Sequence, residues 1–268
     1  MSKMEKGNRF IDKIRRGEVC IGTEISLRDP VTTEALATSG LFDILWIEME
    51  HMAVSLETVE RHVMATKGTN VMTIVRVGWN DPVLIKPVLD IGVPAVIVPL
   101  VQTADDVRNA VRACRYPPDG IRGFGPRRSA DTLEFGAVGG PDWIKKSNEE
   151  MITVVQIEHI EAVNNLDEIL AVPGLSGIMI GSNDLSGSMG FVGQPRHPEV
   201  LKTIDTVIEK TRAAGPFVGI ALGPDPEIHI EWAKKGIQWL QMGGDTDLMT
   251  IGAKAITSRV REAIASYT

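Results

Sequence analysis

Short apolar runs rich in valine and isoleucine recur along the chain at fairly even intervals. Most of them do not alternate strictly between apolar and polar residues, which is typical of parallel strands covered by helices. Eight runs are therefore predicted to be strands, at residues 19–26, 44–51, 71–78, 95–101, 151–158, 177–184, 217–223 and 239–244. Amphipathic segments between them predict helices, among them residues 55–68, 81–92, 103–116, 161–172 and 197–215.

Eight strand–helix units in a chain of 268 residues predict an α/β protein with a (β/α)8 barrel, also called a TIM barrel. A doubly wound open sheet is the alternative that the same pattern leaves open. No stretch has the composition of a linker, and there is no repeat beyond the strand–helix period itself. We therefore expect residues 1–268 to form a single domain.

Composition and charge narrow the class of protein. An apolar fraction of 43% with 24% charged residues is typical of a globular protein, and a net charge of −7 argues against nucleic acid as a partner. The longest apolar runs, such as residues 95–101, are too short to cross a bilayer, and the N-terminus lacks the apolar core of a signal peptide. Cys20 and Cys114 give no disulfide framework, so we expect buried thiols in a cytoplasmic protein with no membrane partner.

Two successive predicted strands end on a carboxylate. Glu158 closes the strand at 151–158, and Asp184 closes the next one, at 177–184. If the strands are parallel, both acids lie at the same rim of the sheet, where they repel each other unless a cation lies between them. The sequence therefore predicts a divalent metal held by Glu158 and Asp184, and a hard ion such as Mg²⁺ or Mn²⁺ suits two carboxylates. The alternatives are a buried Glu158 satisfied by its neighbours and an Asp184 that only caps a helix.

Gln156 lies two residues before Glu158, so the period of a strand points both side chains the same way. An inward-facing pair at the carboxyl end of a barrel strand is typical of an active-site strand. His159 falls on the opposite face, and we expect it to face or cap a helix rather than to bind the metal.

Three more residues are candidates for chemistry. His51 ends the predicted strand 44–51 and can take a proton near neutral pH, although a structural histidine is the alternative. Arg76 lies in an apolar run and must find an anion, either a barrel carboxylate or a negative charge on the substrate. Asp90 falls in the last turn of the predicted helix 81–92, against the helix dipole, so it needs a positive partner or a histidine unless it lies at the surface with no role.

The lysines and one long connection add two expectations. Every lysine falls in a predicted helix, in a loop or at the N-terminus, so a Schiff-base lysine in a strand is disfavoured. Residues 117–140 form an unusually long connection, which we expect at the rim that carries the active site. It contains Arg127 and Arg128, which could meet an anionic substrate tail or only solvent and an interface.

Ordered motifs recur from about residue 22 to the C-terminus. They are Glu50-His51, Arg76 with Trp79-Asn80-Asp81-Pro82, Val98-Pro99 with Val101-Gln102, Arg115-Tyr116-Pro117-Pro118 with Gly120-Ile121-Arg122-Gly123, Gln156-Ile157-Glu158, and Asp184-Leu185-Ser186. Together these motifs resemble one family, the HpcH/HpaI family of metal-dependent, class II pyruvate aldolases. The resemblance implies a (β/α)8 barrel that cleaves a 4-hydroxy-2-keto acid to pyruvate and an aldehyde.

For the keto acid, the resemblance implies that Glu158 and Asp184 bind the metal, which would be Mg²⁺, Mn²⁺ or Co²⁺. Gln156 is expected to contact the pyruvate moiety. The loop before Asp184 reads Gly181-Ser182-Asn183 here, whereas the family commonly has Gly-Pro-Ala. Backbone N–H groups at Ser182 and Asn183 would hold the substrate carboxylate.

For the proton transfers, the resemblance implies that His51 is the proton acceptor. Asp90, from a neighbouring subunit, would raise its basicity, and Arg76 would stabilise the enolate-type transition state. Glu48-Met49 stands where the family commonly has an aspartate followed by glycine or methionine. This departure, like the one before Asp184, puts the particular substrate in doubt rather than the metal.

The resemblance also implies an assembly, because family members are typically hexamers built as trimers of dimers, with the last helix exchanged between subunits. The amphipathic run 247–265 could be that helix. Two other reactions could use the same metal and enolate, namely decarboxylation of a 2-keto acid and cleavage of an acyl-CoA thioester. A catalytically silent assembly or ligand-binding protein is the alternative from another class.

Overall fold

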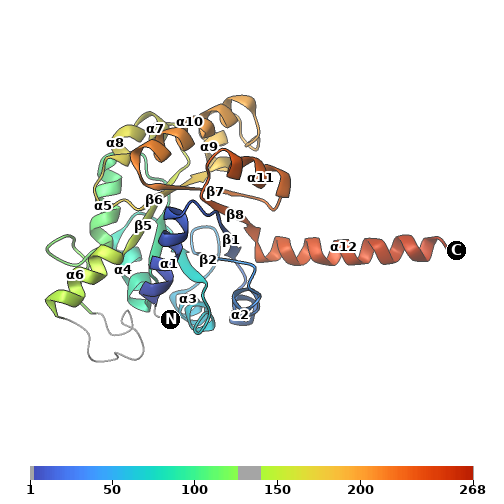
Figure 1. Cartoon of the computed structure of the whole chain (residues 1–268), viewed down its shortest axis with the longest axis horizontal. Helices are drawn as coiled ribbons and strands as arrows, with labels where there is room; N and C mark the ends of the chain where they lie inside the picture. Colours follow the sequence, from blue (N-terminus) through green and yellow to red (C-terminus); the bar gives the residue numbers. More distant parts are fainter. Residues whose placement is uncertain (1–2, 126–139, 268) are drawn as a thin grey trace.

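Eight parallel strands close into a barrel in the computed structural model, which describes residues 3–125 and 140–267 (Figure 1). Each strand pairs with the next one in the sequence, and β8 pairs with β1. The strands are β1 (Cys20–Ile25), β2 (Ile44–Glu48), β3 (Met72–Arg76), β4 (Ala95–Val98), β5 (Ile152–Ile157), β6 (Gly177–Gly181), β7 (Phe217–Leu222) and β8 (Trp239–Gly244). The predicted (β/α)8 barrel is confirmed, and closure of the sheet excludes the doubly wound alternative.

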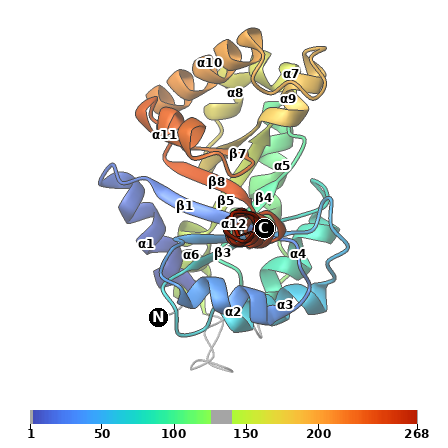
Figure 2. The same ribbon diagram turned by 90° about the vertical axis from the view of Figure 1, so that its right-hand side faces the viewer.

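Helices surround the barrel (Figure 2). Those between the strands are α2 (Pro30–Thr38), α3 (Leu56–Ala65), α4 (Pro82–Ile91), α5 (Ala104–Cys114), α6 (Pro141–Glu150), α7 (Ile160–Asn164), α8 (Leu166–Leu170), α9 (Ser182–Ser188), α10 (Pro198–Ala214) and α11 (Pro226–Lys234). The side chain of Asp81 caps the first turn of α4, and Gly92 ends that helix in the left-handed region, with φ of 104°. The predicted helix 161–172 is instead two short helices that meet at Asn165.

The barrel interior and the layer between strands and helices form two separate apolar cores. Helix α1 (Lys3–Arg15) brings Phe10 into the interior core, where its ring lies edge-on to Phe217 and Trp239 at centroid distances of 5.2 and 6.0 Å. Cys20 lies in this interior core and Cys114 in the outer one, both as free, buried thiols. The prediction of buried thiols is therefore correct.

Several strands end earlier than the sequence predicts, and β2 and β6 are the two whose ends bear on the predicted site residues. Strand β2 stops at Glu48 rather than at residue 51, because the backbone N–H groups of Glu50 and His51 turn back to donate to the Glu48 carboxylate. Strand β6 stops at Gly181, and the chain passes directly into α9, so Asp184 lies in the first turn of a helix. The cap position of α9 belongs to Gly181, so the alternative of Asp184 as an N-cap is wrong.

The long connection begins at the wrong end of the barrel for an active-site loop. Residues 115–125 follow α5, which has already returned the chain from the carboxyl end of β4 to the end where β5 begins. A loop after a helix lies opposite the rim where barrel enzymes carry their chemistry, so the predicted location is wrong for these residues. Arg127 and Arg128 lie outside the described residues.

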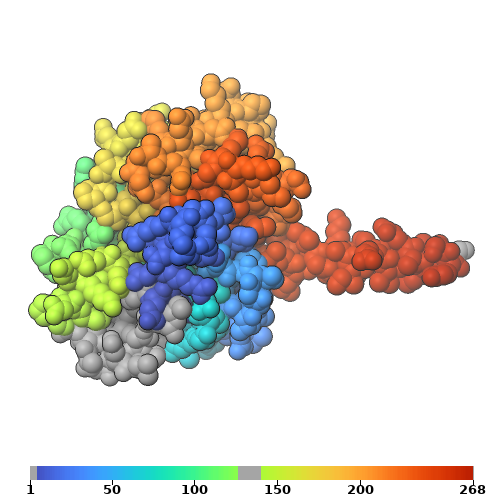
Figure 3. Space-filling view, in the orientation of Figure 1, coloured from blue at the N-terminus to red at the C-terminus, as the bar shows by residue number. Residues whose placement is uncertain are grey.

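Helix α12 (Asp245–Ala265) projects away from the barrel instead of packing on it (Figure 3). Its 21 residues include large apolar side chains that are exposed to solvent: Met249, Ile251, Ile256, Val260 and Ile264. Within the described part of the chain, no helix is long and apolar enough to cross a membrane.

Candidate active site

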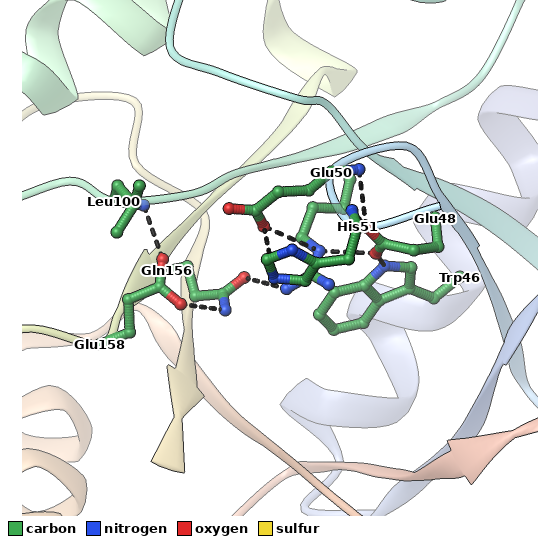
Figure 4. Close-up of polar contacts among 8 residues, drawn as sticks. Trp46, Glu48, Glu50, His51, Leu100, Gln156 and Glu158 are labelled. Atoms are coloured by element: carbon green, nitrogen blue, oxygen red, sulfur yellow. Dashed lines mark hydrogen bonds and ion pairs between the residues drawn. The ribbon is translucent and has the colours of Figure 1, made fainter. Parts of the chain in front are cut away.

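Polar side chains from neighbouring strands meet inside the carboxyl end of the barrel. Glu48 and Arg76 end the paired strands β2 and β3, and Gln156 points inward from β5. Figure 4 shows the side chains of Glu48, Glu50, His51, Gln156 and Glu158 at the mouth of the barrel, where the strands end. Hydrogen bonds and ion pairs of Arg76 join Glu48, Glu50 and Gln156, so the six side chains form one connected row. The row is buried except at His51, whose side chain is 62% exposed.

Arg76 is the centre of this row. Its Nε lies 2.6 Å from Glu48 Oε2 and 3.2 Å from Glu50 Oε2, and its Nη1 donates to Gln156 Oε1 at 3.3 Å. The guanidinium also lies over the ring of Trp46, 4.9 Å from its centroid. Burial alone would lower the pKa of Arg76, but the charges of Glu48 and Glu50 raise it above its ordinary value. The anion that the sequence required for Arg76 is therefore a barrel carboxylate.

Glu48 holds the loop that carries His51. Its Oε1 accepts the backbone N–H groups of Glu50 at 2.6 Å and His51 at 2.8 Å, and its Oε2 accepts Trp46 Nε1 at 2.9 Å. The His51 ring then lies at the open side of the mouth, with Nε2 3.8 Å from Glu50 Oε2. The structure thus places a titratable imidazole beside a carboxylate at the entrance, as a proton acceptor would require.

Glu158 is held from two sides. Its Oε1 accepts the backbone N–H of Leu100 at 2.7 Å, and its Oε2 accepts the amide of Gln156. Leu100 reaches it from a left-handed conformation, with φ of 52°, which is uncommon for a residue other than glycine. Gln156 and Glu158 point to the same side, as the strand period predicts, and His159 caps α7 by accepting the N–H of Glu161.

Burial raises the pKa of Glu158 to about 7, although the Leu100 N–H opposes that shift. The charges of Glu50 and Asp184 raise it further, which shows that the three carboxylates lie close enough to repel one another. Burial also raises the pKa of Glu50 to about 7, against the lowering effect of Arg76. The carboxylates at the mouth of the barrel therefore carry more negative charge than the single positive charge of Arg76 balances.

Gly181 makes room for this arrangement. A Cβ on Gly181 would lie 2.7 Å from Glu158 Oε2 and 2.8 Å from Gln156 Nε2, so a side chain there would displace both groups. After Gly181, the buried Ser182 hydroxyl donates to the Ala221 carbonyl at 3.2 Å. Asn183 is exposed and borders a cavity of about 950 Å³, which Arg196, Leu222 and Ile251 also line.

The structure does not bring Asp90 to His51 within one chain. Helix α4 runs back from the mouth, so its last turn lies at the other end of the barrel. There Asp90 Oδ1 lies 2.6 Å from Arg122 Nη2, which is the positive partner that its position in the helix required. A contact between Asp90 and His51 needs a second subunit and stays a prediction.

Glu158 and Asp184 are the residues that could hold a cation here. Their carboxylate oxygens are the donors that Mg²⁺ and Mn²⁺ prefer, and their mutual repulsion is what a divalent ion would remove. Residues 3–125 and 140–267 contain no group of three or more His, Cys, Asp or Glu side chains that could hold a metal. The two acids would thus leave several positions open for substrate and water.

Three site residues were not predicted as such from the sequence. Trp46 and Glu48 lie two residues apart in β2, so the strand period was the signal that both face inward with the site. Glu24 faces inward from β1, beside Trp46 of β2. Burial and the charge of Glu48 raise the pKa of Glu24 to about 7.

A closed (β/α)8 barrel with an arginine, three glutamates and a histidine gathered at the carboxyl ends of its strands has the organisation of a barrel enzyme. Comparison with known proteins identifies the family. Residues 25–250 match the HpcH/HpaI aldolase/citrate lyase family, and the chain belongs to it.

Relatives span nearly the whole chain. The 4-hydroxy-2-oxo-heptane-1,7-dioate aldolase of Salmonella paratyphi C (strain RKS4594) is 40% identical over 252 residues, which cover 94% of each chain. The crystal structure of a HpcH/HpaI aldolase/citrate lyase family protein from Burkholderia cenocepacia J2315 superposes with a TM-score of 0.85 at 29% identity, covering 91% of this chain and 95% of that one. The HpcH/HpaI aldolase from Desulfitobacterium hafniense DCB-2 gives 0.84 at 30% identity, covering 92% and 95%.

The resemblance inferred from the sequence motifs is therefore confirmed. The protein is an enzyme, a carbon–carbon lyase of the aldolase class that cleaves a 4-hydroxy-2-keto acid to pyruvate and an aldehyde. The silent assembly or ligand-binding protein is excluded as a reading of the sequence.

The raised pKa of Glu24 generates a prediction about stability. Its ordinary pKa of 4.5 rises to about 7 in the folded protein, so folding favours the neutral carboxyl. The stabilisation is fully present below pH 4.5 and is lost as the pH rises through 7. We expect the unfolding free energy of the wild type to fall relative to that of Glu24→Gln between pH 5 and 8, by roughly 3 kcal/mol at most. Urea unfolding at several pH values measures this.

Glu168→Gln, at an exposed position of α8, is the matched control and should follow the wild type at every pH. A constant difference between the wild type and Glu24→Gln across this range would contradict the assignment of a raised pKa to Glu24.

Proposed function

We propose that the enzyme uses a divalent metal ion, Mg²⁺ or Mn²⁺, held by Glu158 and Asp184, to bind the keto acid end of its substrate. The observation that supports this most directly is Glu158 itself, a buried carboxyl fixed by Leu100 and Gln156 and repelled by Glu50 and Asp184. Hydrogen bonds from an N–H and an amide do not neutralise this charge, whereas a divalent cation does. When bound, such an ion acts as a Lewis acid on the carbonyl of the keto acid.

The pyruvate half is positioned by groups on β5 and at the start of α9. Gln156 already links Glu158 to Arg76, so a keto acid bound at Glu158 lies within reach of the guanidinium. The backbone N–H groups of Ser182 and Asn183 lie directly before Asp184 in the chain and would hold the substrate carboxylate. The buried Ser182 hydroxyl is taken by the Ala221 carbonyl, so its contribution is that of its backbone.

His51 is the proposed proton acceptor for the hydroxyl at C4. Its ring lies at the entrance, where an aldehyde product can leave, and Glu50 stabilises the imidazolium that forms. Loss of the proton lets the C3–C4 bond break, with the electron pair moving into the keto acid as an enolate. Protonation at C3 then gives pyruvate.

Arg76 is the proposed stabiliser of the enolate oxygen. Its contacts with Glu48, Glu50 and Gln156 use Nε and Nη1, so Nη2 is the nitrogen available to the substrate. Because the guanidinium is fixed by these partners and by Trp46, it needs no reorganisation when negative charge develops.

The enzyme is also proposed to act as a homo-oligomer, a hexamer built as a trimer of dimers. The exposed apolar side chains of α12 support this, because a helix that projects into water with this composition is stabilised when a second copy covers it. The same assembly would be needed to bring Asp90 of one subunit to His51 of another.

Metal removal tests the proposed cofactor. Exchange of the pyruvate methyl protons with D₂O, followed by NMR, reports enolate formation without any aldehyde. We expect chelation with EDTA followed by desalting to lower the exchange rate by about 100-fold or more, and Mg²⁺ or Mn²⁺ to restore it. Unchanged thermal unfolding before and after chelation is the control for folding. Full exchange by the chelated enzyme would contradict the proposal.

Arg76→Lys tests the proposed enolate stabiliser. Lysine keeps a positive charge beside Glu48, so the fold should survive, but an ammonium cannot satisfy Glu48 and Gln156 while also reaching the substrate. We expect kcat for retro-aldol cleavage to fall by about 100-fold.

Arg61→Lys, on the exposed surface of α3, is the matched control and should leave kcat unchanged. If Arg76→Lys retains a near-normal kcat, another group stabilises the enolate.

Charged substitutions on α12 test the proposed assembly. Ile256 and Val260 lie one turn apart and are 68% and 52% exposed. Replacing both with aspartate should convert the oligomer to a smaller species, because buried carboxylates would oppose association. Light scattering coupled to size-exclusion chromatography measures the mass. Lys254→Ser, on the opposite side of the same helix, should leave the mass unchanged, and an unaltered oligomer in the double variant would show that α12 is not the contact.

A further inference from the structure

The half of the mouth opposite Glu158 and Asp184 contains two polar side chains that the proposed mechanism does not use. Glu24 faces inward from β1 and Gln241 from β8, and these two strands are paired. Because the keto acid is proposed to bind at β5 and α9, we expect the aldehyde half of the substrate to extend across the mouth toward β1 and β8. Glu24 and Gln241 are polar side chains on that side.

Gln241 carries an unused hydrogen-bond donor. The side chain is 2% exposed, and its Oε1 accepts Trp239 Nε1 at 3.2 Å. Its Nε2 is buried and has no hydrogen-bond partner among the described residues. A buried amide without an acceptor costs roughly 1–3 kcal/mol, so this group is held ready for an acceptor that the chain does not supply.

Gly22 and Glu24 of β1 and Gln241 of β8 lie next to one another in the pairing of these two strands. A Cβ on Gly22 would lie 2.5 Å from Gln241 Oε1, so the Gln241 side chain occupies the space above this glycine. Gly22 is paired with Gln241 across the two strands, and Glu24 follows Gly22 by two residues on the same face of β1. The amide and the carboxyl thus lie on one wall of the mouth.

The Glu24 carboxyl has no hydrogen bond or ion pair in the described parts of the chain, whereas the neighbouring acids each have hydrogen-bond partners. Asp245 accepts the Ser26 hydroxyl and backbone N–H groups of the loop after β1. Asp247 accepts the backbone N–H of Gly244 at the start of α12. Glu48 is bound to Arg76. The Glu24 carboxyl is therefore the member of this group that is available to a ligand.

The Gln241 amide and the Glu24 carboxyl together favour a hydroxyl group on the substrate. A hydroxyl can accept the Gln241 amide and donate to the Glu24 carboxyl at the same time, whereas a methyl group can do neither. A carboxylate would accept from Gln241 but would meet four acids, Glu24, Glu48, Asp245 and Asp247, against the single positive charge of Arg76. An ammonium would suit the acids but could not accept from the amide.

We propose that Glu24 and Gln241 form a subsite for a hydroxyl group on the aldehyde half of the substrate, so that this enzyme selects uncharged hydroxyaldehydes over aldehydes that end in a carboxylate. The proposal rests on the proposed function, because the metal at Glu158 and Asp184 fixes which half of the substrate faces β1 and β8. It distinguishes this chain from its Salmonella paratyphi C relative, whose name specifies a heptane-1,7-dioate.

Aldol addition of pyruvate to three aldehydes tests the subsite. Glycolaldehyde carries a hydroxyl, propanal has a methyl group in its place, and succinic semialdehyde ends in a carboxylate. We expect the wild type to use glycolaldehyde with a kcat/KM at least about 10-fold above that for either of the others. Glu24→Leu and Gln241→Leu should each lower the ratio of glycolaldehyde to propanal by about 5-fold or more, because the hydroxyl loses one partner.

Two further variants sharpen the test. Glu24→Gln keeps hydrogen-bonding capacity but removes the charge, so it should retain the preference for glycolaldehyde over propanal while improving the use of succinic semialdehyde. If either leucine variant fails to fold, Glu24→Gln still tests the subsite. Glu168→Gln, at an exposed position of α8, should leave all three ratios unchanged.

Pyruvate methyl-proton exchange is measured on every variant, since it needs no aldehyde. Exchange at the wild-type rate with an altered aldehyde ratio supports the subsite. Normal exchange with ratios that stay within twofold of the wild type in the folded variants overturns the subsite but leaves the proposed function intact. A wild type that prefers succinic semialdehyde overturns it as well. If the wild type shows no metal-dependent exchange, the proposed function fails and the subsite fails with it.

Discussion

The buried pair between Glu48 and Arg76 is the interaction on which the rest of the site depends. Both side chains are almost fully enclosed in the barrel, where an isolated charge is strongly unfavourable. Removing Arg76 would leave the Glu48 charge buried without a compensating cation, at a cost of about 3–5 kcal/mol. The pair also determines positions beyond itself, since Glu48 accepts the N–H groups of the His51 loop and Arg76 holds Gln156.

The two ends of the barrel are filled by different kinds of side chain. Aromatic side chains from α1, β7 and β8 pack together at the closed end. At the open end, small residues stand where larger ones would fill the mouth, and Gly22 and Gly181 each leave space that a neighbouring polar side chain occupies. The mouth is therefore lined by polar groups that approach the backbone closely, which is a setting in which a substrate can be surrounded.

Much of this architecture follows from local sequence patterns. The eight Val- and Ile-rich runs predicted the barrel because parallel strands covered by helices need no polar alternation, and the strand period alone placed Gln156 and Glu158 on one side. The ends of the strands could not be predicted from the sequence. Strand β2, for example, ends where the Glu48 carboxylate accepts the backbone N–H of Glu50. That contact depends on where the chain turns, and the local pattern of apolar and polar residues does not determine this.

The site residues and locations that the sequence did not predict also depend on contacts between distant parts of the chain. The pKa of Glu24 is raised by burial and by the charges of acids on β2 and α12, all distant in the sequence. The register between β1 and β8 also shifts by one residue between Gly22 and Glu24, so its neighbours cannot be read from a regular ladder. The long connection was misplaced because residues 115–125 follow a helix rather than a strand, and Asp90 needs a second subunit to reach the site.

The backbone of Leu100 has a consequence for how this site tolerates substitution. The group that Leu100 gives to Glu158 is its main-chain N–H, presented by the left-handed turn after β4. Nineteen of the twenty genetically encoded residues carry that N–H, and proline alone lacks it. A scan by alanine would therefore pass over this position, although it fixes a carboxylate at the centre of the chemistry. The contact therefore constrains the backbone conformation at position 100, which β-branched residues rarely adopt, rather than any atom of the leucine side chain.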